Sequence, residues 1–237
     1  MALQMSCQNI RQKLVDLSDD GGEKWFKYYS SHHQILLVDE VVRKYKKAMS
    51  NLIALTKMGA CVLHGVDATQ MKFHPYLEMR RFDRIIFNFP HAGFHGKESN
   101  FSMIQKHKDL VRGFFMNAGS MLRSNGEIHV NHKTKPPYDA WRIKELGIQN
   151  FLWPIECVQF KKEDYPGYNN KRGDGSRSDE PFHLGKCSTF KFALLTKNEF
   201  YPTNQRTLSY HHYPLISLTP HSPPSAKLVA EMDTFQY

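Results

Sequence analysis

The stretch FDRIIFNFPHAGFHG, residues 82–96, consists of two halves of opposite character. Its first half has the β-branched and aromatic content of a buried strand, whereas Pro90, Gly93 and Gly96 in the second half interrupt strand pairing. The pattern predicts a strand that ends in a corner made of Asn88, Phe89, Pro90 and His91. Ligands bind beyond the carboxyl ends of the strands in parallel α/β sheets, so this corner is a candidate site. The alternative is a buried strand that simply ends in a Pro-Gly loop.

Helical and strand patterns alternate along the rest of the chain. Residues 41–58 repeat apolar side chains with a period of 3.6 and are followed by Gly59, which is typical of a helix and its C-terminal glycine. Strict alternation of this kind predicts an α/β sheet. Further helices are predicted at 103–122 and 139–148, and strands at 33–38, 61–66, from 126, at 150–160 and at 187–195.

Composition predicts one domain with a tail at each end. The 237 residues suffice for one sizeable core, and we expect a poorly ordered arm at 1–22 with a short helix near 10–17, a domain at 23–197 and a Pro-rich, disordered tail at 198–237. The four cysteines lie far apart, which favours reduced thiols. We find no secretory leader and no apolar run long enough to span a membrane, so we expect an intracellular protein of the nucleus, nucleolus or cytoplasm.

Two longer strings resemble one protein family. The Asn-Phe-Pro-His turn resembles motif IV of S-adenosylmethionine-dependent methyltransferases that modify base nitrogens. The strings RIIFNFPHAGFHGKE and EDYPGYNNKRGDGSR are similar to the rRNA uridine-N3-methyltransferase-like proteins, which are well represented in plants, and the resemblance runs from Lys24 to Leu195. It implies a Rossmann-like class I methyltransferase sheet, S-adenosylmethionine as cofactor and a uridine of ribosomal RNA as substrate.

The resemblance also implies roles for individual residues. The target base is expected against Asn88 and Phe89, with His91 as proton acceptor, although a structural hydrogen bond at a tight corner would explain His91 equally well. Asp67 and Ala68 are expected at the adenine of the cofactor, and the alternative for Asp67 is a cap on the next turn.

One departure from the family concerns the cofactor. The family's first strand runs into a glycine-containing loop, a helix and a second strand that ends in an acidic residue, but here Val38 is followed at once by Asp39, Glu40 and a helical pattern. A unit on the order of 30 residues is therefore missing. We expect weak or absent S-adenosylmethionine binding, and predict that 61–66 pairs directly with 35–38. The competing hypothesis is a catalytically inactive RNA- or protein-binding remnant of the fold.

The segment between the last two strands is rich in cations and tyrosines. With a net charge of +9, the chain favours an anionic partner, and this segment supplies phosphate contacts and stacking surfaces for RNA. Its acidic residues support an alternative, a lid whose charges pair with one another. The predicted RNA-binding residues are Lys161, Lys162, Tyr165, Tyr168, Lys171, Arg172 and Arg177.

A metal site at His91 and His95 is not expected. Pro90 and Gly93 prevent the helix that would place both imidazoles on one face, and no HExxH motif is present.

Overall fold

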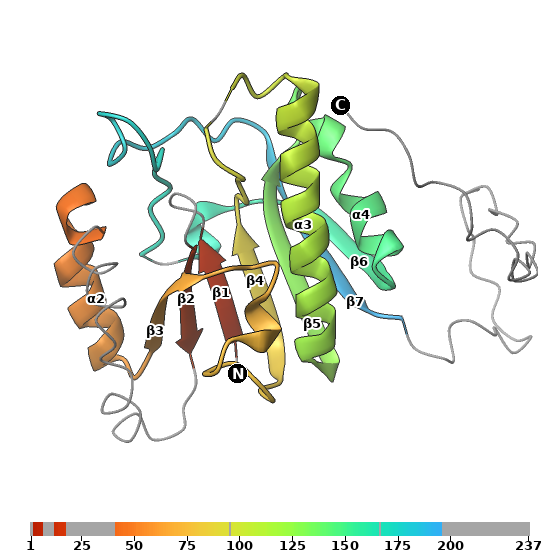
Figure 1. Ribbon diagram of the computed structural model, residues 1–237, viewed down its shortest axis with the longest axis horizontal. Helices are drawn as coiled ribbons and strands as arrows, with labels where there is room; N and C mark the ends of the chain where they lie inside the picture. The colour runs from red at the N-terminus through yellow and green to blue at the C-terminus, as the bar shows by residue number, and fades with distance from the viewer. Residues whose placement is uncertain (1, 7–11, 18–40, 95, 166, 196–237) are drawn as a thin grey trace, which may run out of the picture. The chain divides into compact units, whose positions relative to one another are not determined.

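The computed structural model describes residues 2–6, 12–17, 41–94, 96–165 and 167–195, and only the backbone of the first two segments. The predicted strand at 33–38, His95 and the tail at 198–237 therefore lie outside the described residues. Seven strands form one sheet in the order β3-β2-β1-β4-β5-β7-β6 (Figure 1). Their bounds are β1 Ala2–Ser6, β2 Gln12–Leu17, β3 Cys61–Val66, β4 Phe82–Asn88, β5 Leu122–Lys133, β6 Leu152–Gln159 and β7 Cys187–Leu194.

The predicted α/β class is confirmed, and the parallel strands at the centre of the sheet are typical of a Rossmann-like fold. β4 pairs in parallel with β1 on one side and with β5 on the other. β7 runs antiparallel to both β5 and β6, so this edge of the sheet ends in an antiparallel hairpin. Because β4 and β5 are parallel, their carboxyl ends lie at the same edge of the sheet.

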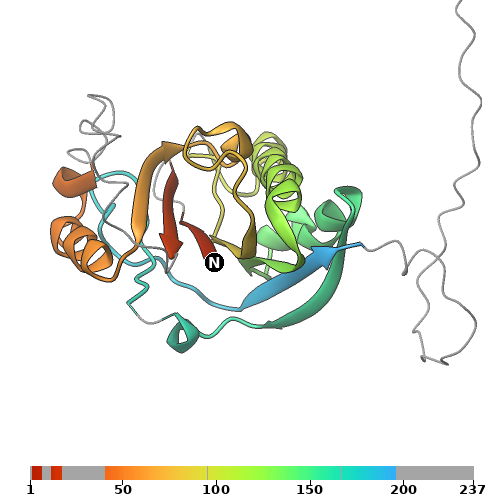
Figure 2. The same cartoon turned by 90° about the horizontal axis from the view of Figure 1, so that it is seen from below.

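Two helices cover one face of the sheet next to β5 and β7. The long helix α3 spans Phe101–Met121 and α4 spans Ile143–Gln149 (Figure 2). Phe114 of α3 packs on Phe87 of β4 with ring centroids 4.8 Å apart, and Phe115 packs on Phe192 of β7 at 4.9 Å. All four rings are fully buried, which stabilises the core by roughly 2 kcal/mol for each side chain. A Cβ at Gly147 of α4 would lie 2.3 Å from the ring of Phe192, so this close approach requires glycine.

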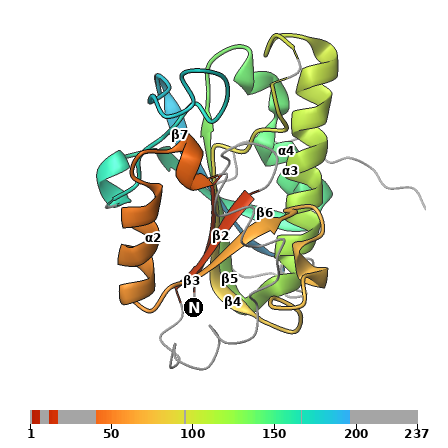
Figure 3. The same cartoon turned by 60° about the vertical axis from the view of Figure 1, so that its left-hand side comes forward.

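A third helix, α2, lies beside β3 at the opposite edge of the sheet and spans Ala48–Lys57 (Figure 3). The predicted helix at 41–58 is interrupted: residues 41–44 form a separate helical turn, and the regular pattern resumes at Ala48. Tyr45 is buried at this interruption, and its hydroxyl lies 3.5 Å from the carbonyl oxygen of Gly173. Burial of the Tyr45 side chain against the loop after β6 thus accompanies the break.

The N-terminal residues differ from the expectation. The short helix predicted near 10–17 is wrong for 12–17, because Gln12–Leu17 forms β2, which pairs antiparallel with β3 and with β1. Cys61–Val66 therefore pairs with Gln12–Leu17, whereas its predicted partner at 35–38 is outside the described residues. An unpaired strand edge leaves backbone N–H and C=O groups without hydrogen-bond partners. β1 pairs with the edge of β4 and β2 pairs with the edge of β3, so both edges gain partners. The tertiary demand for pairing overrides the weak local helical pattern.

The end of α3 was also predicted too late. The helix ends at Met121 instead of continuing to Leu122, and β5 begins at Leu122 instead of at residue 126. A Cβ at Gly126 would lie 2.9 Å from the carbonyl oxygen of Phe82, so the glycine allows β4 and β5 to approach closely.

Candidate functional site

A pocket of about 170 Å³ opens beyond the carboxyl ends of β4 and β5. The β4 corner, the end of β5, the segment that follows β5 and the loop between β6 and β7 all contribute side chains to it. Its walls combine aromatic rings with cations and one carboxylate. The lining residues are Phe89, Pro90, His91, Gly93, Phe94, Glu98, His132, Lys133, Tyr138, Trp141, Lys171, Arg172 and Phe182.

The corner itself is formed as the sequence predicts. β4 ends at Asn88, and Phe89 has a φ of 46°, a left-handed conformation that side chains other than glycine rarely adopt. The Phe89 N–H donates to the carbonyl oxygen of Asn131 at 2.8 Å, which holds this conformation in place. Strained backbone of this kind often occurs at ligand sites.

A buried hydrogen-bond network connects the corner with two other strands. Asn131 Nδ2 donates to Asn88 Oδ1 at 2.6 Å, while Asn131 Oδ1 accepts from Thr189 Oγ1 at 2.6 Å and from the Tyr165 hydroxyl at 3.4 Å. Asn88 Nδ2 is buried without a hydrogen-bond partner, so both N–H donors of this amide group are unused. The sequence analysis did not find Asn131. Its only signal was the predicted strand from Gly126, since the register that places Asn131 opposite Asn88 is a tertiary property.

The loop between β6 and β7 folds over the corner with aromatic contacts. Phe89 lies edge-on to Phe160 and Phe182, with ring centroids 5.2 and 5.3 Å away. Its ring is nearly parallel to that of Tyr168, at 6.4 Å and 11°. The structure thus brings two predicted groups together, the corner and the tyrosines of the predicted RNA-binding loop.

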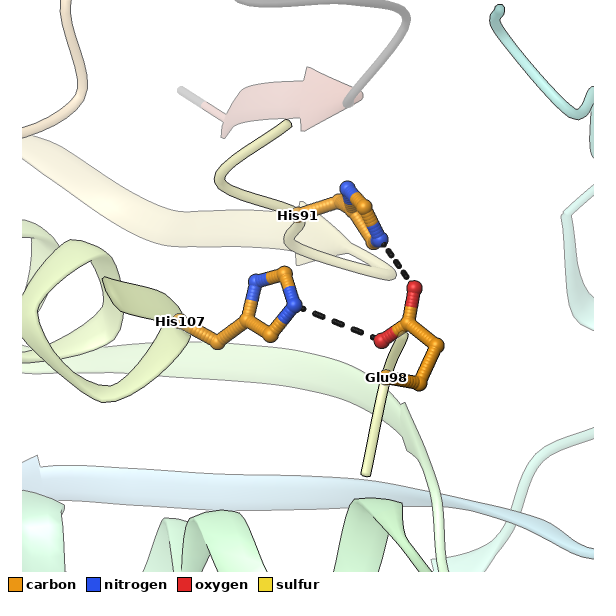
Figure 4. A group of neighbouring side chains, drawn as sticks. All are labelled: His91, Glu98 and His107. Atoms are coloured by element: carbon orange, nitrogen blue, oxygen red, sulfur yellow. Dashed lines mark hydrogen bonds and ion pairs between the residues drawn. The ribbon is translucent and has the colours of Figure 1, made fainter. Parts of the chain in front are cut away.

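His91, the last residue of the corner, and His107 both face the carboxylate of Glu98 (Figure 4). His91 Nε2 lies 2.7 Å from Glu98 Oε1, and His107 Nε2 of α3 lies 3.3 Å from Glu98 Oε2 with poorer alignment. Burial by itself would raise the pKa of Glu98, but its hydrogen bonds and charge interactions with His107 and His91 lower that pKa to about 2. Neither Glu98 nor His107 was predicted as a site residue, and they lie 7 and 16 positions beyond His91 in sequence.

The hydrogen bonds of the two imidazoles indicate where their protons lie. His107 Nδ1 accepts from the Ala92 N–H at 3.0 Å, and His91 Nδ1 accepts from the Gly93 N–H at 3.2 Å. A neutral ring whose Nδ1 is an acceptor has its proton on Nε2, so both Nε2–H groups point to Glu98. A metal bound at Nε2 would require the proton on Nδ1, where a backbone N–H already points.

These three residues have ligand atoms within 4.8 Å of one another, as in a metal site, yet the proton positions favour a carboxylate held by two imidazoles. The same geometry bears on His91 as a proton acceptor. Its Nε2 donates to Glu98, and its Nδ1 accepts from Gly93. His91 would therefore have to release the Gly93 N–H before accepting a proton, which favours the structural alternative for this residue.

The charges of the predicted RNA-binding loop are largely paired within it. Lys171 Nζ lies 2.8 Å from Asp179, and Arg172 and Arg177 share Glu180 at 3.7 and 3.8 Å. Lys161 and Lys162 are exposed, as the RNA interpretation expects. The structure supports the predicted lid with paired charges, while RNA contact by these residues remains a prediction.

After β3, the edge strand of the sheet, the residues predicted for the cofactor form a local turn. Asp67 Oδ1 accepts from the Thr69 N–H and from the Thr69 hydroxyl, each at 2.8 Å. Asp67 is exposed, whereas Ala68 is fully buried. This geometry favours the turn cap as the role of Asp67. Only the exposed Asp67 carboxylate suits adenine, and the chain has no glycine loop after Val38 for the methionine end, so the residues present do not fit the whole cofactor.

The described helices include none with the length and apolar character needed to cross a membrane. Among the described residues, Cys61, Cys157 and Cys187 form no disulfide bond.

Comparison with known proteins identifies the family. Residues 34–172, more than half of the chain, match the BMT5-like family model, described as rRNA (uridine-N3-)-methyltransferase BTM5-like. The 25S rRNA (uridine(2634)-N(3))-methyltransferase of Saccharomyces cerevisiae is 28% identical over 120 residues, which is 37% of this chain and 35% of the yeast protein.

Two relatives from Arabidopsis thaliana are more similar. Heavy metal-associated isoprenylated plant protein 41 is 54% identical over 204 residues, and the match covers 74% of this chain and 40% of that protein. The chain thus spans less than half of this relative. The uncharacterized protein At4g26485 is 41% identical over 202 residues, covering 72% of this chain and 97% of that protein. The chain belongs to the BMT5-like family of rRNA (uridine-N3-)-methyltransferases.

Proposed function

We propose that this chain binds single-stranded ribosomal RNA and holds a uridine at the β4 corner, the RNA-recognition part of the family's reaction. The observation that carries the proposal is the corner itself, where β4, β5, β7 and the loop after β6 meet around one unused amide N–H₂ group, Asn88 Nδ2. Uracil presents two carbonyl oxygens as acceptors, so an amide N–H₂ group at this position suits a uracil edge.

The aromatic surroundings of the corner support the same function. Unpaired bases stack on aromatic side chains, and each stacked base contributes about 1–3 kcal/mol to binding. Phe89 and Tyr168 are nearly parallel and belong to two different segments, the corner and the loop. Asn88 is only 1% exposed, so we expect the loop to open when a base enters. The ion pairs of Lys171, Arg172 and Arg177 lie within the loop and can persist when it opens, whereas the ion pair of Asp174 with Lys44 at 3.9 Å would have to separate.

The methyl-transfer step is a separate matter. When bound, S-adenosylmethionine supplies the methyl group in this family, but the residues of this chain do not fit the whole cofactor. We therefore assign no methyl-transfer step to the residues of this chain. The residues described here bind and orient RNA, and Glu98 with its two imidazoles stabilises the segment after the corner.

The test uses fluorescence anisotropy of a labelled, U-containing single-stranded RNA and the full chain at several salt concentrations. We expect binding whose affinity falls as salt is raised, because phosphate contacts release counterions. Tyr168→Leu should weaken binding by about tenfold, in line with the loss of one stacked base. Tyr168→Phe is the matched control, since it retains the ring and should bind nearly as the unmodified chain does.

Two outcomes would contradict the proposal. One is an absence of RNA binding by the folded chain at low salt. The other is equal binding by Tyr168→Leu and Tyr168→Phe, which would show that RNA binds away from the corner.

A further inference from the structure

Lys133 occupies an unusual position in the pocket. It is the last residue of β5, and its Nζ lies between two aromatic rings, 4.8 Å from the centroid of Tyr138 and 5.0 Å from that of Phe182. Lys133 is half-buried, and all three residues line the pocket. A cation in this arrangement is attracted by both ring faces but remains available to an anion.

The other two cations of the pocket have different partners. Lys171 is paired with Asp179, and Arg172 with Glu180. Within the described residues, Lys133 forms no such ion pair. Glu98 is the carboxylate of the same pocket, and its two oxygens face His91 and His107. Among the described cations of the pocket, Lys133 is thus the one without a carboxylate at ion-pair distance, although the charge of Glu98 acts on it from further away.

Burial of this ammonium carries a free-energy cost. Desolvation lowers the pKa of Lys133, although the charges of Cys187 and Glu98 act in the opposite direction. A ligand anion at Nζ would compensate for the lost hydration, because a charge-assisted hydrogen bond is about twice as strong as a neutral one. The aromatic walls next to Nζ suit a flat ring, so the preferred ligand combines a base with a phosphate.

We propose that Lys133 binds the phosphate of the nucleotide whose base enters the pocket, so that the site recognises a nucleoside monophosphate unit in preference to a nucleoside. This inference rests on the proposed function and extends it, since the proposed function requires only that a uridine base reaches the corner. Phosphate held by β5 and a base held at the end of β4 would place one nucleotide across two adjacent parallel strands.

The experiment compares three small ligands by nuclear magnetic resonance titration of the full chain: uridine, uridine 5′-monophosphate and inorganic phosphate. We expect the monophosphate to bind about tenfold more tightly than uridine, the usual effect of one charged hydrogen bond. Inorganic phosphate should bind more weakly than the monophosphate because it gains no stacking. The U-containing RNA of the anisotropy assay then shows whether a backbone phosphate uses the same lysine.

Lys133→Met removes the charge and retains an apolar stem between Tyr138 and Phe182. It should abolish the advantage of the monophosphate over uridine and leave uridine binding unchanged, and it should weaken RNA binding and reduce its salt dependence. Lys135→Met, an exposed lysine two positions further on, is the matched control and should retain the full advantage. Thermal unfolding of both variants confirms that they are folded.

The outcomes separate the two proposals. If Lys133→Met retains the tenfold ratio, the phosphate assignment to Lys133 is wrong; if inorganic phosphate binds as well as the monophosphate, recognition of a whole nucleotide unit is wrong. In both cases RNA binding at the corner stands. If uridine, the monophosphate and RNA all fail to bind the folded chain, both proposals are wrong.

Discussion

The carboxyl end of β3 and the carboxyl ends of β4 and β5 lie on one sheet but are built differently. After β3, the exposed Asp67 carboxylate accepts hydrogen bonds from Thr69, and the Asp67 carbonyl oxygen accepts one from the Gln70 N–H. After β4, Asn88 is 1% exposed and is connected to Asn131 of β5 and, through it, to Thr189 of β7. At the first end the predicted site residue bonds only within its local segment, although Asn117 of α3 donates to the Thr69 carbonyl oxygen, whereas at the second end the predicted site residue is joined to two other strands.

This difference indicates which part of the family's site the chain retains. The missing unit after Val38 would lie on the β3 side, and there the predicted cofactor residue takes part in a three-residue turn. The groups near β4 and β5 come from segments beyond the missing unit, and the hydrogen bonds that join Asn88, Asn131 and Thr189 are present. We therefore expect loss of one unit to affect the proposed cofactor side more than the proposed base side.

The largest expected effect concerns the affinity for the cofactor, and the opposite result would directly contradict the difference between the two ends. Without the glycine loop, we expect S-adenosylmethionine to bind the chain no more tightly than the millimolar range, at least about 4 kcal/mol weaker than micromolar binding. Isothermal titration measures this. Saturable binding with micromolar affinity would show that the β3 side is functionally intact, contrary to the comparison.

A second prediction tests the buried network. Asn131→Ala removes the partners of Asn88 Oδ1 and Thr189 Oγ1, and should lower the free energy of unfolding by about 3 kcal/mol because buried polar groups lose their hydrogen bonds. Asn169→Ala is the matched control, since Asn169 is exposed in the loop. Urea unfolding compares the two. Equal unfolding midpoints would mean that the network contributes no stability.

A third prediction concerns the pH dependence of stability on the β5 side. Burial lowers the pKa of His132 to about 4, although its Nε2–H donates to the Tyr138 carbonyl at 3.1 Å, which acts in the opposite direction. Between pH 6.5 and 4, the unfolded chain binds a proton at this residue that the folded chain does not, so stability decreases as pH falls.

His132→Asn should remove this contribution, about 3 kcal/mol over that range, and flatten the dependence relative to the unmodified chain. Urea unfolding at a series of pH values provides the measurement. His91 and His107 remain in both proteins, so the difference between the two curves isolates His132. Parallel curves would show that His132 is solvated and outside the buried core.

The smallest expected effect is at the β3 end. Asp67→Ala removes the acceptor of two hydrogen bonds from Thr69. It should lower the free energy of unfolding by about 1 kcal/mol at most, because Asp67 is exposed. Asp67→Asn retains an oxygen acceptor and serves as control. RNA affinity should not change in either variant. A loss as large as that of Asn131→Ala would contradict the distinction between a local and a tertiary end.

Much of the fold could be predicted because local patterns specify it. The strand that ends at Asn88, the strand at Cys61–Val66 and the long helix now seen at Phe101–Met121 follow from β-branched runs and a 3.6-residue period. The corner was also visible, since proline and glycine interrupt strand pairing wherever they occur. The helix predicted at 10–17 was wrong because pairing in the sheet outweighs a weak local preference.

The sequence by itself determined the α/β class, the family, the corner at Asn88–His91 and the absence of a glycine loop after Val38, since these depend on residue types and their spacing. Only the tertiary structure decided that Asn131, Glu98, His107 and Lys133 join the corner, and that Asp67 caps its own turn. The reason is physical. Strand register, the packing of α3 and the path of the loop after β6 set these contacts, and they bring together residues that no local pattern connects.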